Sequence, residues 1–290
     1  MNKKLTFAVV GGDMRQIFLA KQLCLDNHNV FSFAIDRFSF EEDIKPLSIA
    51  DFSKADVIIL PMPIQREKGV LNAPLCNTSY KLDLIINSIP SKKMVFAGGI
   101  TKEVKNQAKR NEILLYDYLE REELAILNAI PTCEGAIELA MRELLITLHG
   151  AKVLVIGNGR IGSILSDALS ALHAKVTVSA RSPKDFAWIT SKGLNYLNTN
   201  KLIGKLNDFD LIINTVPALV LGAGELSNIN ENCLIIDLAS NAGGVDFNYA
   251  EKIGIRAIHA LSLPGKVAPI SAATAIKNTI YTILQEEKVL

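Results

Sequence analysis

Lys152-Val-Leu-Val-Ile156 runs directly into Gly157-Asn158-Gly159-Arg160-Ile161-Gly162, and a helical stretch, residues 164–172, follows. A strand, a GxGxxG turn, a helix and a second strand together indicate a dinucleotide-binding unit. In such a unit the first glycine permits a tight turn, the second lets the backbone approach a diphosphate, and the third lets the helix pack on the sheet. Residues 152–182 therefore predict a nicotinamide-cofactor site.

The choice of cofactor is expected to depend on the end of the second strand, which reads Ser179-Ala180-Arg181-Ser182. NAD-preferring sites carry an acidic residue there, about 20 positions after the glycines. An arginine flanked by serines instead suits a 2′-phosphate, because guanidinium and phosphate form charge-assisted hydrogen bonds. The sequence favours NADP, and NAD stays open if Arg181 is only a solvated loop cation.

Two more loops follow strands beyond the switch point of the sheet and are expected near the nicotinamide, although ordinary strand-to-helix turns would look the same. The residues expected to bind the cofactor are Gly157, Asn158, Gly159, Arg160, Ile161, Gly162, Ala180, Arg181, Ser182, Thr215, Val216, Pro217, Leu238, Ala239 and Ser240.

Apolar runs and amphipathic stretches alternate along all 290 residues, which predicts an α/β fold with two doubly wound parallel-sheet, Rossmann-like lobes. The expected strands are residues 5–10, 30–34, 57–60, 94–96 and 113–116, and then 152–156, 175–179, 211–214, 234–237 and 257–260. The expected domains are 1–127, a helix at 128–149 that crosses between the lobes, and 150–270, with a C-terminal helix at 271–290 that returns to the first lobe.

The crossover helix is expected to begin at Pro131-Thr132-Cys133-Glu134-Gly135. Thr132 would be its N-cap, and Glu134 would complement the helix dipole. A purely structural role suffices for both residues. The alternative is that this helix start faces the substrate. Cys133 is interpreted as a small filler residue, although a helix start could lower its pKa.

In the first lobe, Gly11-Gly12-Asp13-Met14-Arg15-Gln16 occupies the place of a glycine fingerprint. Asp13 and Gln16 replace its second and third glycines, so a second dinucleotide is not expected. Arg15 at a helix start could hold a carboxylate, or it could form a solvent-exposed ion pair with Asp13. The expected substrate-side residues are Asp13, Arg15, Gly98, Gly99, Thr132, Glu134, Pro264 and Gly265, with Gly98-Gly99 and Pro264-Gly265 expected in loops.

The charge balance and cysteine spacing exclude several classes of function. A net charge of +1 provides no field for nucleic acid or an anionic membrane. No secretion signal or long apolar run is evident, so we expect a soluble, intracellular protein. The four cysteines lack metal-ligand spacing, and no metal is expected.

Several motifs resemble one known family, that of the dipicolinate synthase A-subunit, nearly end to end. They are Gly11-Gly12-Asp13-x-Arg15-Gln16, Leu60-Pro61-x-Pro63, Ala125-Ile126-Leu127-Asn128-x-Ile130-Pro131-Thr132-x-Glu134-Gly135-Ala136 and Leu263-Pro264-Gly265-x-Val267-Ala268-Pro269. The resemblance implies oxidation of dihydrodipicolinate to dipicolinate with NADP, in the cytoplasm of the mother cell of a spore-forming bacterium. It also implies a small dicarboxylate substrate and a flavoprotein partner, the second component of the dipicolinate synthase.

Two other functions stay open. One is a 2-hydroxy-acid or amino-acid dehydrogenase, for which His259 and Lys266 are weak catalytic candidates. The other is a nucleotide-binding scaffold for a flavoprotein. The sequence names no proton acceptor, and a homo-oligomer is also open.

Overall fold

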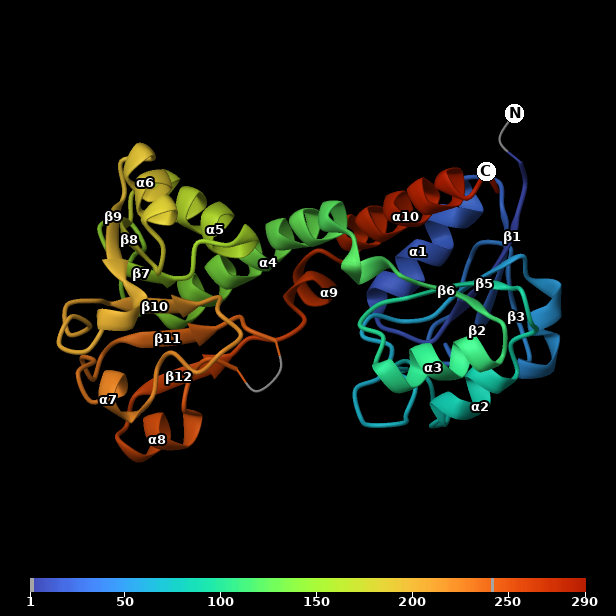
Figure 1. The fold of residues 1–290 in the computed structure, drawn as a ribbon, viewed down its shortest axis with the longest axis horizontal. Helices are drawn as coiled ribbons and strands as arrows, with labels where there is room; N and C mark the ends of the chain where they lie inside the picture. The colour runs from blue at the N-terminus through green and yellow to red at the C-terminus, as the bar shows by residue number, and fades with distance from the viewer. Residues whose placement is uncertain (1–2, 241–242) are drawn as a thin grey trace. The chain divides into compact units, whose positions relative to one another are not determined.

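The computed structural model describes residues 3–240 and 243–290. The chain forms two compact units, shown in Figure 1. Unit 1 contains residues 1–128 and 268–290, and unit 2 contains residues 129–267. Each unit is built on its own six-stranded sheet, and all neighbouring strands in both sheets are parallel. The predicted α/β class with two doubly wound sheets is confirmed.

The sheet of unit 1 has the strand order β3-β2-β1-β4-β5-β6, so the strand order reverses beside β1. Helices α1 and α10 cover one face, and α2 and α3 cover the other. The elements are β1 (Thr6–Val10), α1 (Met14–Leu25), β2 (Asn29–Phe33), β3 (Ile44–Pro46), the 3-10 helix η1 (Ile49–Lys54), β4 (Val57–Ile59), α2 (Leu82–Asn87), β5 (Met94–Ala97), α3 (Lys102–Arg110), β6 (Leu114–Asp117), the 3-10 helix η2 (Tyr118–Glu120) and α10 (Pro269–Glu286).

The sheet of unit 2 has the order β12-β11-β10-β7-β8-β9, which reverses beside β7. Part of α4 and helix α5 cover one face, while α7 and α8 lie over the other. The elements are α4 (Glu122–Glu143), which passes from unit 1 into unit 2, β7 (Lys152–Ile156), α5 (Arg160–Ala171), β8 (Lys175–Ala180), α6 (Pro183–Ser191), β9 (Asn195–Asn198), the 3-10 helix η3 (Thr199–Lys201), β10 (Leu211–Asn214), α7 (Ala223–Leu226), β11 (Leu234–Asp237), α8 (Phe247–Lys252), β12 (Arg256–His259) and α9 (Leu263–Val267).

Helix α10 packs beside α1 in unit 1, as its apolar stripe predicted (Figure 1). Ala273, Ile276 and Ile280 are at most 1% exposed and join the core formed with β1 and α1. At the end of the helix, Glu286 accepts two hydrogen bonds of 2.8 Å from Arg121. The C-terminal segment therefore completes the hydrophobic core of the N-terminal unit.

The predicted start of the crossover helix is wrong. Helix α4 begins at Glu122, nine residues before Pro131, and that proline lies inside it. A proline is compatible with a helix interior when the rest of the helix packs well, because it removes one backbone hydrogen bond and bends the helix. Thr132 and Glu134 are consequently interior helical residues, not an N-cap and a first-turn acid.

The segment Leu263-Pro264-Gly265-Lys266, which the sequence predicts as a loop, instead forms most of helix α9. Helix α4 is 22 residues long. Among the residues that the structure describes, it is the one helix long and apolar enough to cross a membrane. Of its apolar window 44% is buried, and core helices of water-soluble proteins meet the same criterion.

Candidate functional site

The turn between β7 and α5, residues 157–162, requires glycine at two positions for reasons internal to the protein. Gly157 has φ +101°, and its N–H donates to the carbonyl of Ser179 at 2.9 Å. A Cβ there would lie 2.5 Å from Oγ1 of Thr215. A Cβ on Gly162 would lie 2.1 Å from the carbonyl oxygen of Gly157. These two glycines therefore allow the tight turn and the close approach of α5.

Gly159 differs from both, because nothing in the protein lies within 4 Å of where its Cβ would be. It is the N-cap of α5, and no side chain caps the helix there. The space above Gly159 is open, which suits an anionic group at the positive end of the helix dipole of α5. The turn has the geometry needed to hold a diphosphate.

A cavity of 820 Å³ lies beside this turn, at the carboxyl ends of β7, β8 and β10. Its volume falls within the range of small-molecule and cofactor pockets. The predicted residues that line it are Gly157, Asn158, Gly159, Ala180, Arg181, Ser182, Thr215, Val216 and Pro217. Those that do not line it are Arg160, Ile161, Gly162, Leu238, Ala239 and Ser240. The structure thus brings together three of the four predicted loops.

Arg181 lies exposed at the end of β8 and lines this cavity. Its side chain makes no hydrogen bond or ion pair within the described part of the chain, so the guanidinium has free donors. Thr199 and Asn200, which follow β9, line the same cavity and were not predicted. Because β9 is short and polar, its residues carry no clear signal for a strand.

Asp185 is a carboxylate of the same cavity that was not predicted either. It lies in the first turn of α6, where Ser182 is the N-cap. The Ser182 hydroxyl donates to Oδ2 of Asp185 at 2.6 Å and accepts from the Asp185 amide at 3.1 Å. The Ser-Pro-Lys-Asp spacing is a capping-box pattern, which is the signal that could have found it.

Asn214 and Asp237, at the ends of β10 and β11, form a fully buried polar pair that was also missed. The Asn214 amide donates to Asp237 at 2.8 Å. The same carboxylate accepts from the backbone amides of Ala239 at 3.0 Å and Gly244 at 2.7 Å. Asn214 also binds both backbone groups of Val216. This pair fixes the two loops expected near a nicotinamide.

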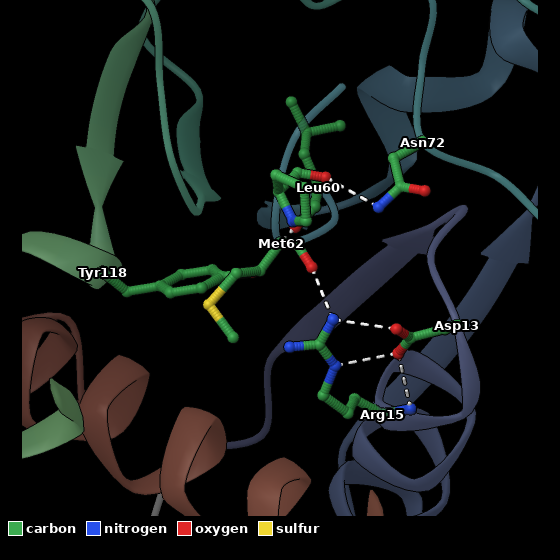
Figure 2. A network of polar contacts seen from close by, with 7 residues as sticks. Asp13, Arg15, Leu60, Met62, Asn72 and Tyr118 are labelled. Carbon is green, nitrogen blue, oxygen red and sulfur yellow. Dashed lines mark hydrogen bonds and ion pairs between the residues drawn. The ribbon is translucent and has the colours of Figure 1, made fainter. Parts of the chain in front are cut away.

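In unit 1 the central polar feature is an ion pair between Asp13 and Arg15, drawn in Figure 2. Arg15 donates from Nε and an Nη to the two carboxylate oxygens of Asp13, at 2.9 and 2.8 Å. The same Nη donates to the carbonyl oxygen of Met62 at 2.7 Å. The alternative of an ion pair with Asp13 is therefore confirmed, but Arg15 is 6% exposed, so the predicted solvent exposure of the arginine is wrong.

The environment of the Asp13 carboxyl group favours its charged form. Burial raises its pKa, but the hydrogen bonds and positive charge of Arg15, with a smaller contribution from the charge of Arg66, lower the pKa below its ordinary value overall. Asp13 is also the N-cap of α1, accepting from the Arg15 amide at 3.1 Å. A carboxylate of the protein itself thus occupies the start of α1.

Groups of the protein itself also occupy the glycine loop before α1. Gly11 donates its amide to Phe33, and Gly12 donates its amide to the carbonyl of Asn72, both at 2.8 Å. A Cβ on Gly12 would meet Cγ of Gln16 at 2.2 Å, so the Gln16 side chain fills the space over the turn. The start of α1 is therefore unlike the open start of α5, in agreement with a single dinucleotide-type turn in the described part of the chain.

Gly98 and Gly99 form a loop after β5, as expected. A Cβ on Gly98 would lie 2.6 Å from Met62 and 2.9 Å from the ring of Tyr118. Asp117 accepts from the Gly99 amide at 3.2 Å. The Tyr118 hydroxyl donates to Leu60, and burial raises its pKa. The loop is therefore packed against Met62 and Tyr118, and Asp117 holds it through a hydrogen bond.

The remaining substrate-side candidates lie on the helices of unit 2. Glu134 is exposed and Thr132 is partly exposed on α4. Gly135 permits close packing of α4 on α9, because its Cβ would lie 3.1 Å from Leu263. Burial raises the pKa of Cys133 to about 12, opposite to the effect expected at a helix start. Pro264 and Gly265 belong to α9.

His259 has the surroundings of a packed structural histidine. Its Nε2 lies 3.0 Å from the carbonyl oxygen of Ala239, and its ring stacks on Phe247.

The side chains that commonly bind metal ions are not clustered into a metal site within the described residues. Within residues 3–240 and 243–290, no cluster of three or more His, Cys, Asp or Glu side chains could hold a metal ion.

Comparison with known proteins identifies relatives over nearly the full chain. The sequence profile of the N-terminal domain of the dipicolinate synthase A-subunit matches residues 6–119, and that of shikimate/quinate 5-dehydrogenase matches residues 138–241. The dipicolinate synthase A-subunit of Bacillus subtilis is 36% identical over 289 residues, covering 97% of this chain and 96% of that protein.

Solved structures agree with this similarity. The crystal structure of the dipicolinate synthase A-subunit from Bacillus halodurans has a TM-score of 0.89 and 33% identity, covering 97% of each chain. A transhydrogenase from Sinorhizobium meliloti shares the fold at 16% identity, with a TM-score of 0.71, and covers 98% of this chain and 94% of its own.

Proposed function

The chain belongs to the dipicolinate synthase A-subunit family, and on that premise we propose that it oxidises dihydrodipicolinate to dipicolinate with NADP as hydride acceptor. The family and the dehydrogenase-type fold make it an oxidoreductase. The substrate and the choice of NADP are our proposal. In the reaction, one hydride passes to the cofactor and one proton leaves as the substrate ring becomes aromatic.

The observation that carries the proposal is the open start of α5 beside the unpaired guanidinium of Arg181. The first-turn amides would bind the diphosphate, and Arg181 would bind the 2′-phosphate. Asp185 lines the same cavity, and its Oδ2 accepts a hydrogen bond from the Ser182 hydroxyl that caps α6. Residues 157–162, 180–182, 215–217 and 238–240 form the proposed cofactor site.

Aromatisation of the ring supplies the driving force, so the protein mainly has to position two rings and hold their charges. The Asn214–Asp237 pair supports this role, because its buried hydrogen bonds fix the loops after β10 and β11. On the substrate side we propose the loops of unit 1 that follow β1, β4 and β5, which include Asp13, Arg15, Gly98 and Gly99.

The name of the family, an A-subunit, implies a second component. We propose that this partner is a flavoprotein and that both act in the cytoplasm of the mother cell of a sporulating bacterium. The competing scaffold function predicts that the purified chain cannot transfer hydride without its partner.

The test follows NADPH absorbance and dipicolinate formation by the purified chain, with and without the partner flavoprotein. We expect one dipicolinate per NADPH from the chain alone, and slower turnover with NAD. A matched assay replaces dihydrodipicolinate with 2-hydroxy acids and amino acids. Turnover of those compounds, with none of dihydrodipicolinate, would contradict the proposal. Turnover only with the partner present would favour the scaffold function.

A further inference from the structure

A short hairpin after β4, residues 64–72, carries a cation that was not among the predicted site residues. Gln65 and Leu71 form an antiparallel bridge, and the Asn72 amide donates to the carbonyl of Ile64 at 3.0 Å. Arg66 lies on the first arm of this hairpin. Residues 66–69 form the bend and turn between the bridged residues.

The hairpin is anchored to both glycine loops of unit 1. Ile64 donates its amide to the carbonyl of Gly98, and the Asn72 carbonyl accepts from Gly12, each at 2.8 Å. The Asn72 side chain, labelled in Figure 2, donates to the carbonyl of Pro63 at 2.9 Å. The two ends of the segment that carries Arg66 are consequently hydrogen-bonded to the loops after β1 and β5.

This position is the switch point of the sheet. The connection from β1 goes to β2 on one side, while β4 lies on the other side of β1. In open α/β sheets, ligands bind outside the carboxyl ends of the strands at such a point. The loop after β1 and the hairpin after β4 are its two walls in unit 1.

Arg66 and Arg15 differ in what their guanidinium groups already bind. Arg15 is 6% exposed and bound to Asp13 and Met62. Arg66 is exposed, and its side chain has no hydrogen bond or ion pair anywhere in residues 3–240 and 243–290. It lines a cavity of 280 Å³ together with polar residues, which include Glu67, Asn72, Asn77, Thr78 and Ser79.

We propose that Arg66, and not Arg15, binds a carboxylate of the substrate, while Arg15 is a positioning residue that holds Asp13 and the loop after β4 at Met62. A free guanidinium binds a carboxylate through two parallel charge-assisted hydrogen bonds. Arg15 already uses this geometry to bind Asp13. The inference rests on the proposed function only in taking an aromatic dicarboxylate as the ligand.

The experiment measures binding to the full chain by calorimetry, with dipicolinate, isophthalate and pyruvate as probes and NADPH as an independent ligand. Arg66→Gln should weaken dipicolinate binding about 10- to 100-fold and leave NADPH affinity unchanged. Arg66→Lys should recover part of the loss, because it restores the charge without the planar fork. The matched control is Lys68→Gln, an exposed cation of the same hairpin, with less than about a twofold effect.

A second variant tests the role of charge in this cavity by removing a negative charge instead of a positive one. Glu67 lines the same cavity, so Glu67→Gln should strengthen dipicolinate binding by about two- to fivefold. Equal dipicolinate affinity in wild type and Arg66→Gln would overturn the proposal, as would the absence of binding of any carboxylate probe to the wild-type chain. If pyruvate bound in an Arg66-dependent manner and dipicolinate did not bind, Arg66 would still be the carboxylate-binding residue, but the proposed function would be wrong.

Discussion

Asp13 holds Arg15 through two parallel hydrogen bonds of 2.9 and 2.8 Å, and the side chains of Arg15 and Asp13 are 7% and 18% exposed. Asp13→Asn would leave a buried guanidinium without its counter-charge. We expect the free energy of unfolding to fall by about 2 to 3 kcal/mol in urea denaturation. Asp43→Asn breaks an exposed pair with Lys45 and should change it by less than about 0.5 kcal/mol. Equal effects would show that burial does not strengthen the Asp13 pair.

The same pair predicts how stability depends on pH. The folded-state pKa of Asp13 lies below its ordinary value of 3.8. The stabilisation is therefore present above that value and is lost as the pH falls through the folded-state pKa. Between about pH 5 and pH 2 the wild type should lose more stability than Asp13→Asn. Parallel pH profiles for the two proteins would refute this assignment.

The two glycines of the turn in unit 2 should separate folding from ligand binding. Gly162→Ala places a Cβ against Gly157 and should cost about 1 to 3 kcal/mol of stability as well as cofactor affinity. Gly159→Ala meets no protein atom, so its stability cost should be below about 1 kcal/mol. Its NADPH affinity, measured by fluorescence titration, should nevertheless fall at least about tenfold, since the backbone must approach the diphosphate. Unchanged affinity in Gly159→Ala would place the diphosphate elsewhere.

Arg181→Asp tests the choice of cofactor. Loss of a charge-assisted bond to the 2′-phosphate should raise the NADP dissociation constant about 10- to 100-fold, and the new carboxylate should favour NAD. Lys184→Asp makes the same charge change on the exposed surface of α6, outside the cavity, and serves as the control. An equal loss in both variants would indicate a general field effect instead of a 2′-phosphate contact.

Asp237→Asn tests the buried pair in unit 2. The Asp237 carboxylate accepts hydrogen bonds from Asn214, Ala239 and Gly244. In the variant, the amide NH₂ group would face one of these donors and that hydrogen bond would be lost. We expect a loss of about 2 to 3 kcal/mol and a higher KM for the cofactor. Asp208→Asn, on the exposed surface, should change neither quantity. A stable variant with an unaltered KM would show that the pair does not set the loops.

The central strands were predictable, whereas two of the four edge strands were not. The bounds of β7, β10 and β11 match the sequence prediction to the residue, because buried parallel strands are continuous apolar runs. The edge strands β3 and β9 were missed, since each is short, β3 contains a proline and β9 is mostly polar. Their pairing depends on the neighbouring strand more than on their own composition.

In the candidate site, the predictable residues are those whose chemistry is local. The glycine spacing after β7 and the absence of an acid at the end of β8 are visible in the sequence itself. The roles of Asp237 and Arg66 depend on which strands become neighbours, so no spacing rule could have found them. Pro131 was misinterpreted because a proline marks a helix start more often than it lies inside a packed helix.

The position of α10 has a consequence for synthesis on the ribosome. Unit 2 is continuous in the chain, whereas unit 1 lacks its covering helix until residues 268–290 have been translated. The apolar surface of α1 and β1 that α10 covers therefore stays uncovered while unit 2 is being made. The hydrophobic core of unit 1 is thus completed only after the whole of unit 2 has been made.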